Sequence, residues 1–106
     1  MIKFVVVLYR RPDMTMVAFR RYFEETHAPI ARKLPGLLKY VQNFPVTDDK
    51  RTPRWDAVIE LYFASRAAME DAWSTSEGKN ATSDLDAFVD AARSSWAIVD
   101  VVDGLA

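Results

Sequence analysis

Histidine occurs once in this sequence, at position 27, and cysteine does not occur at all. An imidazole with a reference pKa of about 6.5 exchanges protons readily at neutral pH, so His27 is the first candidate for general acid–base catalysis. It follows Phe23 by four residues and Phe19 by eight, which places it at the border of an apolar helix face. The alternative is a structural histidine stabilised by the C-terminal end of the helix dipole.

Tyr40 and Gln42 lie two residues apart in an alternating segment, so both side chains point to one face of a predicted strand. A buried phenol needs a hydrogen-bond partner, and a substrate oxygen is one candidate for Tyr40. A buried amide at Gln42 also needs partners, and a ligand is one option. The alternatives are that Tyr40 fills space between strands and that Gln42 faces solvent. We select Tyr40 as a second catalytic candidate and Gln42 as a substrate contact.

Aromatic side chains make up 12% of the chain, enough to line an apolar pocket as well as a core. We select Phe23, Trp55 and Trp73 as substrate-binding candidates and favour Trp73 slightly. The alternative for each is a place in the core, since aromatic residues at helical or alternating spacing usually pack there. Asp56 and Glu60 are separated by about 13 Å of strand rise, too far apart for a paired-carboxylate hydrolase.

The apolar periodicity predicts four strands and two helical regions in the order β-α-β-β-α-β. The predicted strands cover residues 2–9, 37–46, 55–63 and 96–102, and a polar connection occupies 47–54. The first helix begins after Thr15 as N-cap and ends or bends just before Pro29, which cannot donate a backbone hydrogen bond. The second region begins at Ser65, breaks around Gly78 and resumes at Ser83.

This order predicts an α+β fold of the ferredoxin-like βαββαβ type, with helices on one face of a four-stranded antiparallel sheet. A single domain spans 1–106. Helices can cover only one face of the sheet, yet the first and last predicted strands are apolar on both faces. We therefore expect a homodimer in which the sheet faces of two protomers cover each other.

The 14 basic and 15 acidic side chains nearly cancel and are scattered, so we expect neither a nucleic acid nor a membrane as partner. No apolar run approaches the roughly 20 residues that a membrane-spanning helix needs. The start of the chain does not resemble a signal peptide, so a cytoplasmic location is expected. A single histidine without cysteine gives no His-rich or Cys-ligated metal site, and we predict no cofactor.

Two segments carry a family resemblance. They are Phe19-Arg20-Arg21-Tyr22-Phe23 leading to Glu25-Thr26-His27-Ala28-Pro29, and Leu34-Pro35-Gly36-Leu37-Leu38-Lys39-Tyr40-Val41-Gln42-Asn43. Both resemble the EthD family, and the resemblance extends over nearly the whole chain. It implies a dimeric α/β barrel of two ferredoxin-like protomers. In the same superfamily, muconolactone isomerases have a pocket histidine and a pocket tyrosine at the positions of His27 and Tyr40. Those isomerases also use cysteines, which this chain lacks, so their reaction does not carry over whole.

Three functions are open at this point. The first is cofactor-independent acid–base chemistry on a small apolar oxygenated molecule (aromatic, lactone or polyketide-like), of the isomerase, cyclase or dehydratase type. His27 would then act as base and acid, and Tyr40 would hold the oxygen. The second is a monooxygenase, either cofactor-free or haem-dependent with His27 as axial ligand. The third is a non-catalytic ligand-binding or assembly module. A cavity of about 300–1,000 Å³ beside His27 favours a small-molecule site, and one below about 100 Å³ favours the third function.

Overall fold

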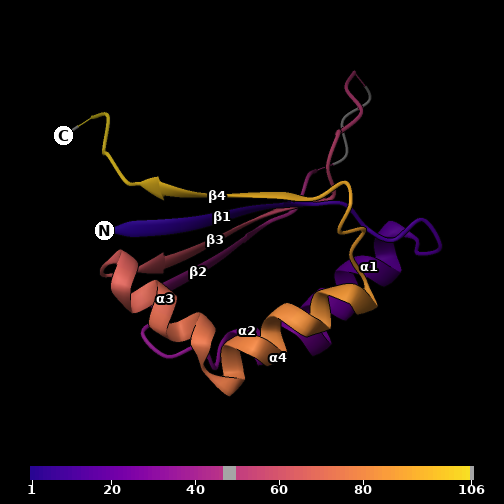
Figure 1. The fold of residues 1–106 in the computed structure, drawn as a ribbon. Coiled ribbons are helices and arrows are strands. Elements are labelled where there is room, and N and C mark those ends of the chain that lie inside the picture. The colour runs from indigo at the N-terminus through magenta and orange to yellow at the C-terminus, as the bar shows by residue number, and fades with distance from the viewer. Residues whose placement is uncertain (47–49, 106) are drawn as a thin grey trace.

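The protein folds around one antiparallel sheet, seen edge-on in Figure 1. The computed structural model describes residues 1–46 and 50–105, so the predicted connection at 47–54 lies partly outside the described residues. The strands are β1 (Ile2–Leu8), β2 (Lys39–Asn43), β3 (Ala57–Phe63) and β4 (Ser95–Asp100), in the spatial order β2-β3-β1-β4. All three pairings are antiparallel, which confirms the predicted ferredoxin-like βαββαβ fold.

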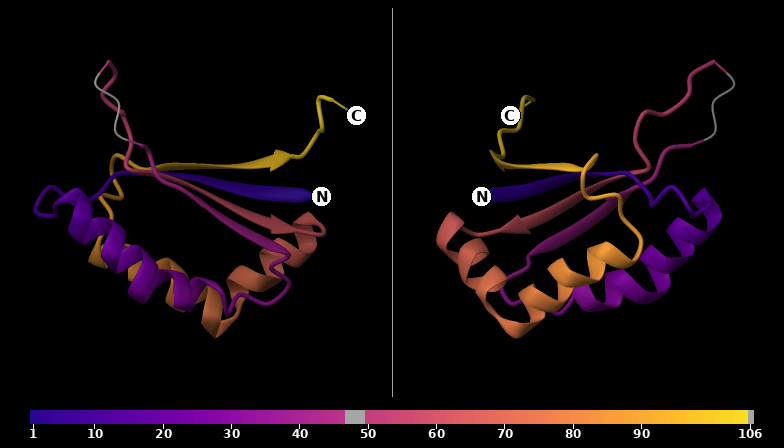
Figure 2. Two further views of the ribbon diagram at one scale, coloured as in Figure 1. Left: turned by 180° about the vertical axis from the view of Figure 1, so that it is seen from behind. Right: turned by 45° about the vertical axis from the view of Figure 1, so that its right-hand side comes forward.

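The described helices all lie on one face of this sheet (Figure 2). The first group is α1 (Met16–Tyr22), the π-helical turn η1 (Phe23–His27) and α2 (Ala28–Ala31). The second group is α3 (Arg66–Ser74), α4 (Ser76–Asp84) and the 3-10 turn η2 (Leu85–Ala87). None of these helices is long and apolar enough to cross a membrane.

The core lies between the sheet and the helices. Alternate residues of β3 are buried because alternate side chains of a strand point to opposite faces. The largest fully buried side chains are Leu8, Phe19, Phe23, Phe63 and Phe88. Phenylalanines from α1, η1 and the segment after η2 therefore meet in one aromatic cluster, and Phe88 is its centre.

The first helical region is interrupted just before Pro29 by the π-type turn and then continues as α2 to Ala31. The predicted interruption of the regular helix is therefore confirmed, and the alternative that the helix ends there is wrong. At η1 the backbone N–H of Ala28 donates to the carbonyl of Phe23, which is the hydrogen bond of a π-type turn. A regular α-helical turn conflicts with the missing N–H and the ring of proline. The widened turn just before Pro29 lets the helix change its hydrogen bonding there and continue as α2.

The second helical region breaks at Thr75 and not around Gly78, so this prediction is also wrong. Thr75 has extended backbone angles (φ −77°, ψ 166°), and its hydroxyl accepts a hydrogen bond from the N–H of Gly78 as the N-cap of α4. Gly78 lies inside α4, where an added Cβ would overlap the carbonyl oxygen of Ala72. The glycine therefore allows two helices to approach closely. Ser83, predicted to start a helix, lies in the last turn of α4.

The outer face of the sheet, opposite the helices, is apolar in the middle. Val5 and Val7 on β1 are half-buried there, and Val7 pairs across the strands with Val58. Lys3 and Glu60 form an ion pair on the same face, with 2.8 Å between Nζ and Oε1. This face thus combines apolar side chains with an ion pair, and toward its edge the ammonium of Lys39 lies over the ring of Tyr62 at 5.4 Å.

Candidate functional site

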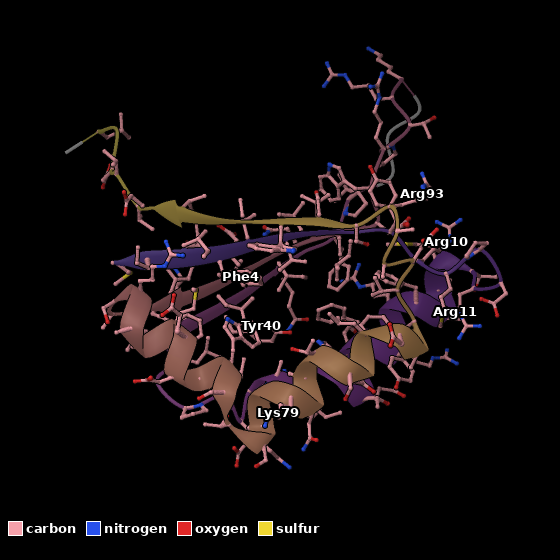
Figure 3. All side chains as sticks on the ribbon, viewed as in Figure 1. Phe4, Arg10, Arg11, Tyr40, Lys79 and Arg93 are labelled. Atoms are coloured by element: carbon pink, nitrogen blue, oxygen red, sulfur yellow. The ribbon has the colours of Figure 1, made fainter. Side chains whose placement is uncertain are left out.

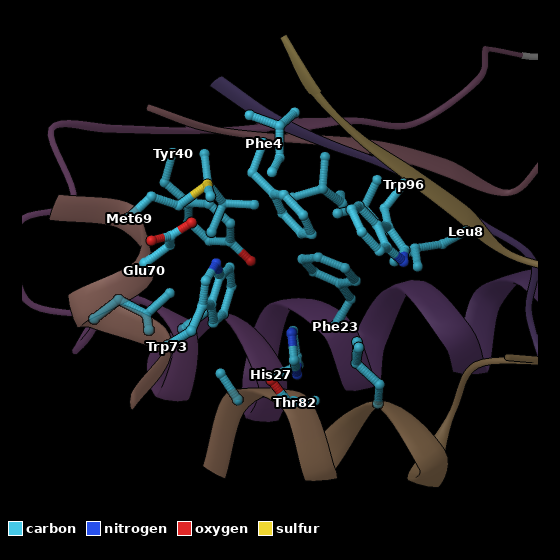
Figure 4. Close-up of a pocket in the computed structure, with 18 residues that line it drawn as sticks. Phe4, Leu8, Phe23, His27, Tyr40, Met69, Glu70, Trp73, Thr82 and Trp96 are labelled. Carbon is cyan, nitrogen blue, oxygen red and sulfur yellow. The ribbon is translucent and has the colours of Figure 1, made fainter. Parts of the chain in front are cut away.

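His27 is the last residue of η1, and its ring forms part of the wall of a cavity between the helices and the sheet (Figure 4). Only 6% of the residue is exposed. The ring packs against Phe23 and Phe88, with centroid separations of 5.3 Å and 5.0 Å. Helical turns of the π type are rare and often occur at functional sites. The imidazole is therefore held between aromatic rings with one edge toward the cavity.

Asp84, the last residue of α4, binds the other edge of this ring. Its Oδ2 lies 2.9 Å from Nδ1 of His27, and the hydroxyl of Tyr22 donates a 2.7 Å hydrogen bond to its Oδ1. An ionised carboxylate accepts hydrogen bonds but does not donate them, so we assign the imidazole proton to Nδ1. The unprotonated nitrogen is then Nε2, and Figure 4 shows a ring nitrogen of His27 directed into the cavity.

The protonation of His27 follows from its burial. Burial lowers the pKa of His27 below its usual 6.5 because the charged imidazolium loses its hydration. The hydrogen bond and the negative charge of Asp84 act in the opposite direction but do not offset this effect. His27 is therefore neutral at pH 7, with an Nε2 lone pair that can accept a proton.

Tyr40 projects from β2 toward the same cavity (Figures 3 and 4). Its hydroxyl oxygen is buried and has no hydrogen-bond partner among the described residues. Burial raises the pKa of Tyr40 far above its usual range, so the hydroxyl stays protonated and can donate. A buried polar group without a partner costs about 1–3 kcal/mol, which an acceptor on a bound ligand would recover.

The cavity has a volume of about 470 Å³, within the range of roughly 300–1,000 Å³ that small-molecule sites occupy. Most of its wall is aliphatic or aromatic. Two further polar residues reach it, but their polar groups already have partners. The Thr82 hydroxyl donates to the carbonyl of Gly78, and the Glu70 carboxylate accepts from Arg66.

The polar lining is otherwise sparse. No lysine or arginine is among the described residues that line the cavity. No cluster of three or more potential metal ligands occurs in the described parts of the chain. His27 and Tyr40 are therefore the polar side chains best placed to act on a ligand.

Three aromatic rings, two from the sheet and one from α3, form a continuous wall of the cavity. The ring of Phe4 lies 5.3 Å from that of Trp73 in an edge-to-face arrangement and 5.5 Å from that of Trp96. Trp96 is on β4, at the edge of the sheet, and 66% of it is exposed. The wall thus runs from the interior, at Trp73, to the rim of the cavity, at Trp96.

Four of the six predicted site residues come together at this cavity: Phe23, His27, Tyr40 and Trp73. Gln42 and Trp55 are not part of its lining. Gln42 is one position further along the same face of β2, toward Phe44, whose ring packs on Phe23 and fills that end of the space. Trp55 precedes β3, and the backbone N–H of the next residue, Asp56, donates to the carbonyl of Leu8 at the end of β1.

Sequence reasoning did not select Asp84, Tyr22, Phe4 or Trp96 as site residues. Asp84 is 57 positions from His27, and no local pattern predicts a contact over that distance. Its position was also obscured by the wrongly predicted helix start at Ser83. The spacing of five residues between Tyr22 and His27 predicts a shared side of the helix only if a π-type turn lies between them, because such turns place residues five apart on one side.

The sequence matches a known family over most of its length. A model of the EthD domain matches residues 11–92. The chain belongs to the EthD domain family. An uncharacterised 11.0 kDa protein from the thcB–thcC intergenic region of Rhodococcus erythropolis is 27% identical over 81 residues, which cover 76% of this chain and 78% of that protein.

Solved structures share the EthD fold. An ethyl tert-butyl ether degradation (EthD) family protein from Bacillus halodurans superposes with a TM-score of 0.82 at 25% identity, over 96% of this chain and 100% of its own. SnoaB from Streptomyces nogalater, described as a cofactor-independent oxygenase, has a TM-score of 0.67 at 14% identity, over 98% and 95%. Two further neighbours, from Bacteroides fragilis and Thermobifida fusca, are described as dimeric ferredoxin-like proteins of unknown function. The neighbours of this EthD chain thus include an oxygenase and dimeric proteins.

Proposed function

We propose that this protein catalyses acid–base chemistry on a small, neutral, oxygenated and largely apolar molecule, without a cofactor. One observation carries the proposal: the cavity-facing edge of His27 and the unpartnered hydroxyl of Tyr40 share one apolar cavity of about 470 Å³. A neutral imidazole held by a carboxylate is a general base, and a buried phenol is a hydrogen-bond donor. Together they suit the removal of a proton next to a carbonyl group.

In the first step, Nε2 of His27 takes a proton from the carbon beside the substrate carbonyl. The electron pair of the broken C–H bond moves into the carbonyl group, and the hydroxyl of Tyr40 donates a hydrogen bond to the resulting enolate oxygen. The imidazolium is stabilised by Asp84 at 2.9 Å. In the second step Nε2 returns the proton, either to another carbon in an isomerisation or to a leaving hydroxyl in a dehydration.

The cavity wall favours neutral substrates with flat apolar rings. The described lining residues include no cation that could pair with a carboxylate or phosphate, and burying an unpaired anion is costly. The rings of Phe4, Trp73 and Trp96 offer faces and edges on which an aromatic or polycyclic ligand can pack. Aromatic ketones and lactones fit this description, and organic acids do not.

A test of the function uses nitrobenzisoxazole, a neutral aromatic probe. A base removes its C–H proton, the electron pair forms a nitrile, and the N–O bond breaks to give a coloured phenolate. We expect saturable elimination above the rate in buffer. The rate rises with pH through a midpoint below 6.5 and is level at neutral pH, because the base acts deprotonated and its pKa is lowered.

Two competitors probe the substrate class in the same assay. Acetylnaphthalene has an acceptor oxygen and no charge, whereas naphthoate has the same rings and an anionic carboxylate. We expect acetylnaphthalene to inhibit with an affinity at least about tenfold higher, a difference of about 1.4 kcal/mol. Equal inhibition by both would contradict the neutral-substrate proposal, and a rate equal to that in buffer would contradict the catalytic one.

An oxygenase reaction is a second candidate, supported by the likeness to SnoaB. The first step is again proton removal: His27 takes the proton of a ring hydroxyl, and the negative charge is shared with a ring carbon. That carbon adds O₂ in place of a proton to give a hydroperoxide, which loses water to leave a quinone carbonyl. The haem-dependent form would need Nε2 of His27 as the iron ligand, but the described lining offers no lysine or arginine to pair with the two haem carboxylates. Oxygen uptake with a dihydroxyanthracene-type probe distinguishes the first form from isomerisation. For the second form, the Soret band of added haem would shift and sharpen relative to haem in buffer, and an unchanged band would exclude it.

We also propose that two protomers pair through the outer faces of their sheets. Val5 and Val7 are half-buried in the single chain, and similar folds include proteins described as dimeric. Sedimentation is expected to give about twice the 12.1 kDa chain mass. Val7→Glu places a charge in this face and should yield monomers, whereas Val17→Glu, at a 69% exposed position on α1, should leave the mass unchanged. A monomeric wild type would contradict the proposal.

A further inference from the structure

We propose that Asp84 and Tyr22 are positioning residues that keep the imidazole proton of His27 on Nδ1 and so leave an unprotonated nitrogen facing the cavity, and that the π-type turn η1 is the feature that makes this possible. This inference rests on the proposed function only where it gives the unprotonated nitrogen of His27 the role of a catalytic base. The hydrogen-bond geometry itself is independent of any reaction.

The role of the turn follows from helix geometry. Residues five apart in an α-helix lie about 140° apart around the axis, so Tyr22 and His27 would point to different sides. In a π-type turn the backbone closes from residue i+5 to residue i, which brings residues five apart to nearly the same side. The hydrogen bond from Ala28 N–H to the Phe23 carbonyl marks that turn. Tyr22 and His27 therefore reach the same carboxylate, at 2.7 Å and 2.9 Å.

The two hydrogen bonds have different consequences. The bond to Oδ2 keeps the imidazole proton on Nδ1, because a carboxylate can only accept. The bond from Tyr22 holds Oδ1, so the carboxylate cannot rotate away from the ring without losing it. Since Asp84 ends α4 and Tyr22 ends α1, this carboxylate also ties the two helical groups together beneath the cavity.

Asp84 also lies at the protein surface, beside another acidic residue that can serve as a control position. It forms part of the wall of a surface hollow between α2 and α4, together with two other charged side chains, Lys33 and Glu77. No hydrogen bond joins Glu77 to His27 among the described contacts. Glu77→Gln therefore removes one negative charge from the same hollow and leaves the partner of the imidazole unchanged. Asp84→Asn removes one negative charge and also changes that partner.

The experiment is nitrogen NMR of protein labelled at histidine, in which the single histidine gives one pair of ring signals. In the wild type we expect Nδ1 to be protonated and Nε2 to be unprotonated. In Asp84→Asn, the Tyr22 hydroxyl retains the amide oxygen and the amide NH₂ faces Nδ1. The major tautomer should then become the one protonated on Nε2. Adding Tyr22→Phe frees the amide to turn over and should partly restore the Nδ1 proton.

The ring titration gives a second measurement. Loss of the Asp84 charge is expected to move the titration midpoint of His27 further down, because that charge favours the imidazolium. Glu77→Gln should leave both the tautomer and the midpoint close to those of the wild type. An Nε2-protonated ring in the wild type overturns the proposal even if the variants fail to fold, and so does a tautomer unchanged in Asp84→Asn.

The elimination assay separates this proposal from the proposed function. If the tautomer of His27 changes in Asp84→Asn as described, and elimination falls in Asp84→Asn but not in Glu77→Gln, both the positioning role and the catalytic function stand. If the tautomer changes in this way but the wild type shows no elimination, the positioning role stands and the catalytic function fails. A fall in elimination that is the same in both variants contradicts the positioning role, because it points to charge alone.

Discussion

Replacing His27 with alanine should reduce the rate constant for nitrobenzisoxazole elimination by roughly 10²–10⁴-fold, the range that general acid–base catalysis contributes. The sequence contains no second histidine. Of the other titratable groups at the cavity, Tyr40 stays protonated, and the carboxylate of Glu70 is 60% exposed and pairs with Arg66 at the surface. Removal of this one ring therefore leaves solvent as the principal proton acceptor.

The measurement compares variants whose folding is verified by circular dichroism. Trp55→Phe changes an aromatic residue outside the cavity and should retain the wild-type rate. Added imidazole is small enough to enter the space left in His27→Ala and is expected to restore part of the rate. A His27→Ala protein that is folded and eliminates at the wild-type rate would show that the base lies elsewhere, and the proposed function would be rejected.

Most of the fold could be predicted from the sequence because its signals are local. β3 alternates between apolar and other residues over its whole length, and the caps Thr15 and Ser65 stand where the helices begin. The errors arose where tertiary contacts decide. Pro29 predicts that the regular helix is interrupted, which the π-type turn confirms, but not that the helix continues beyond it to Ala31. Gly78 predicts a break in isolation, but it permits contact with the end of α3.

For the candidate site as well, the sequence predicts what local signals determine and not what tertiary contacts determine. His27 and Tyr40 could be selected from their own side chains and from the periodicity around them, and both line the cavity. Asp84 could not be selected, since a contact across 57 positions depends on how α4 packs against η1. Gln42 and Tyr40 share a face of β2, yet the space ends between them where Phe44 meets Phe23. Periodicity predicts the face of a strand but not how far a cavity extends along it.

Phe88→Ala should lower the free energy of unfolding by about 3–5 kcal/mol, the usual effect of deleting a fully buried phenylalanine. The side chain is 0% exposed, and its ring packs on four others: Tyr22 at 4.9 Å, His27 at 5.0 Å, Phe19 at 5.5 Å and Phe23 at 5.6 Å. Two of these rings are the hydrogen-bond donors to Asp84. The loss therefore removes core contacts and support for the candidate site together.

Phe44→Ala is the matched control for this substitution, because Phe44 is only half-buried and its ring contacts Phe23 at the margin of the core. Urea unfolding of both variants at equal protein concentration measures the two losses, with concentration fixed because dimerisation would add to apparent stability. In Phe88→Ala the tautomer of His27 should become mixed, since the ring has lost a wall that holds it in the plane of Asp84. A smaller loss of stability for Phe88→Ala than for Phe44→Ala would show that the aromatic cluster is not the centre of this core.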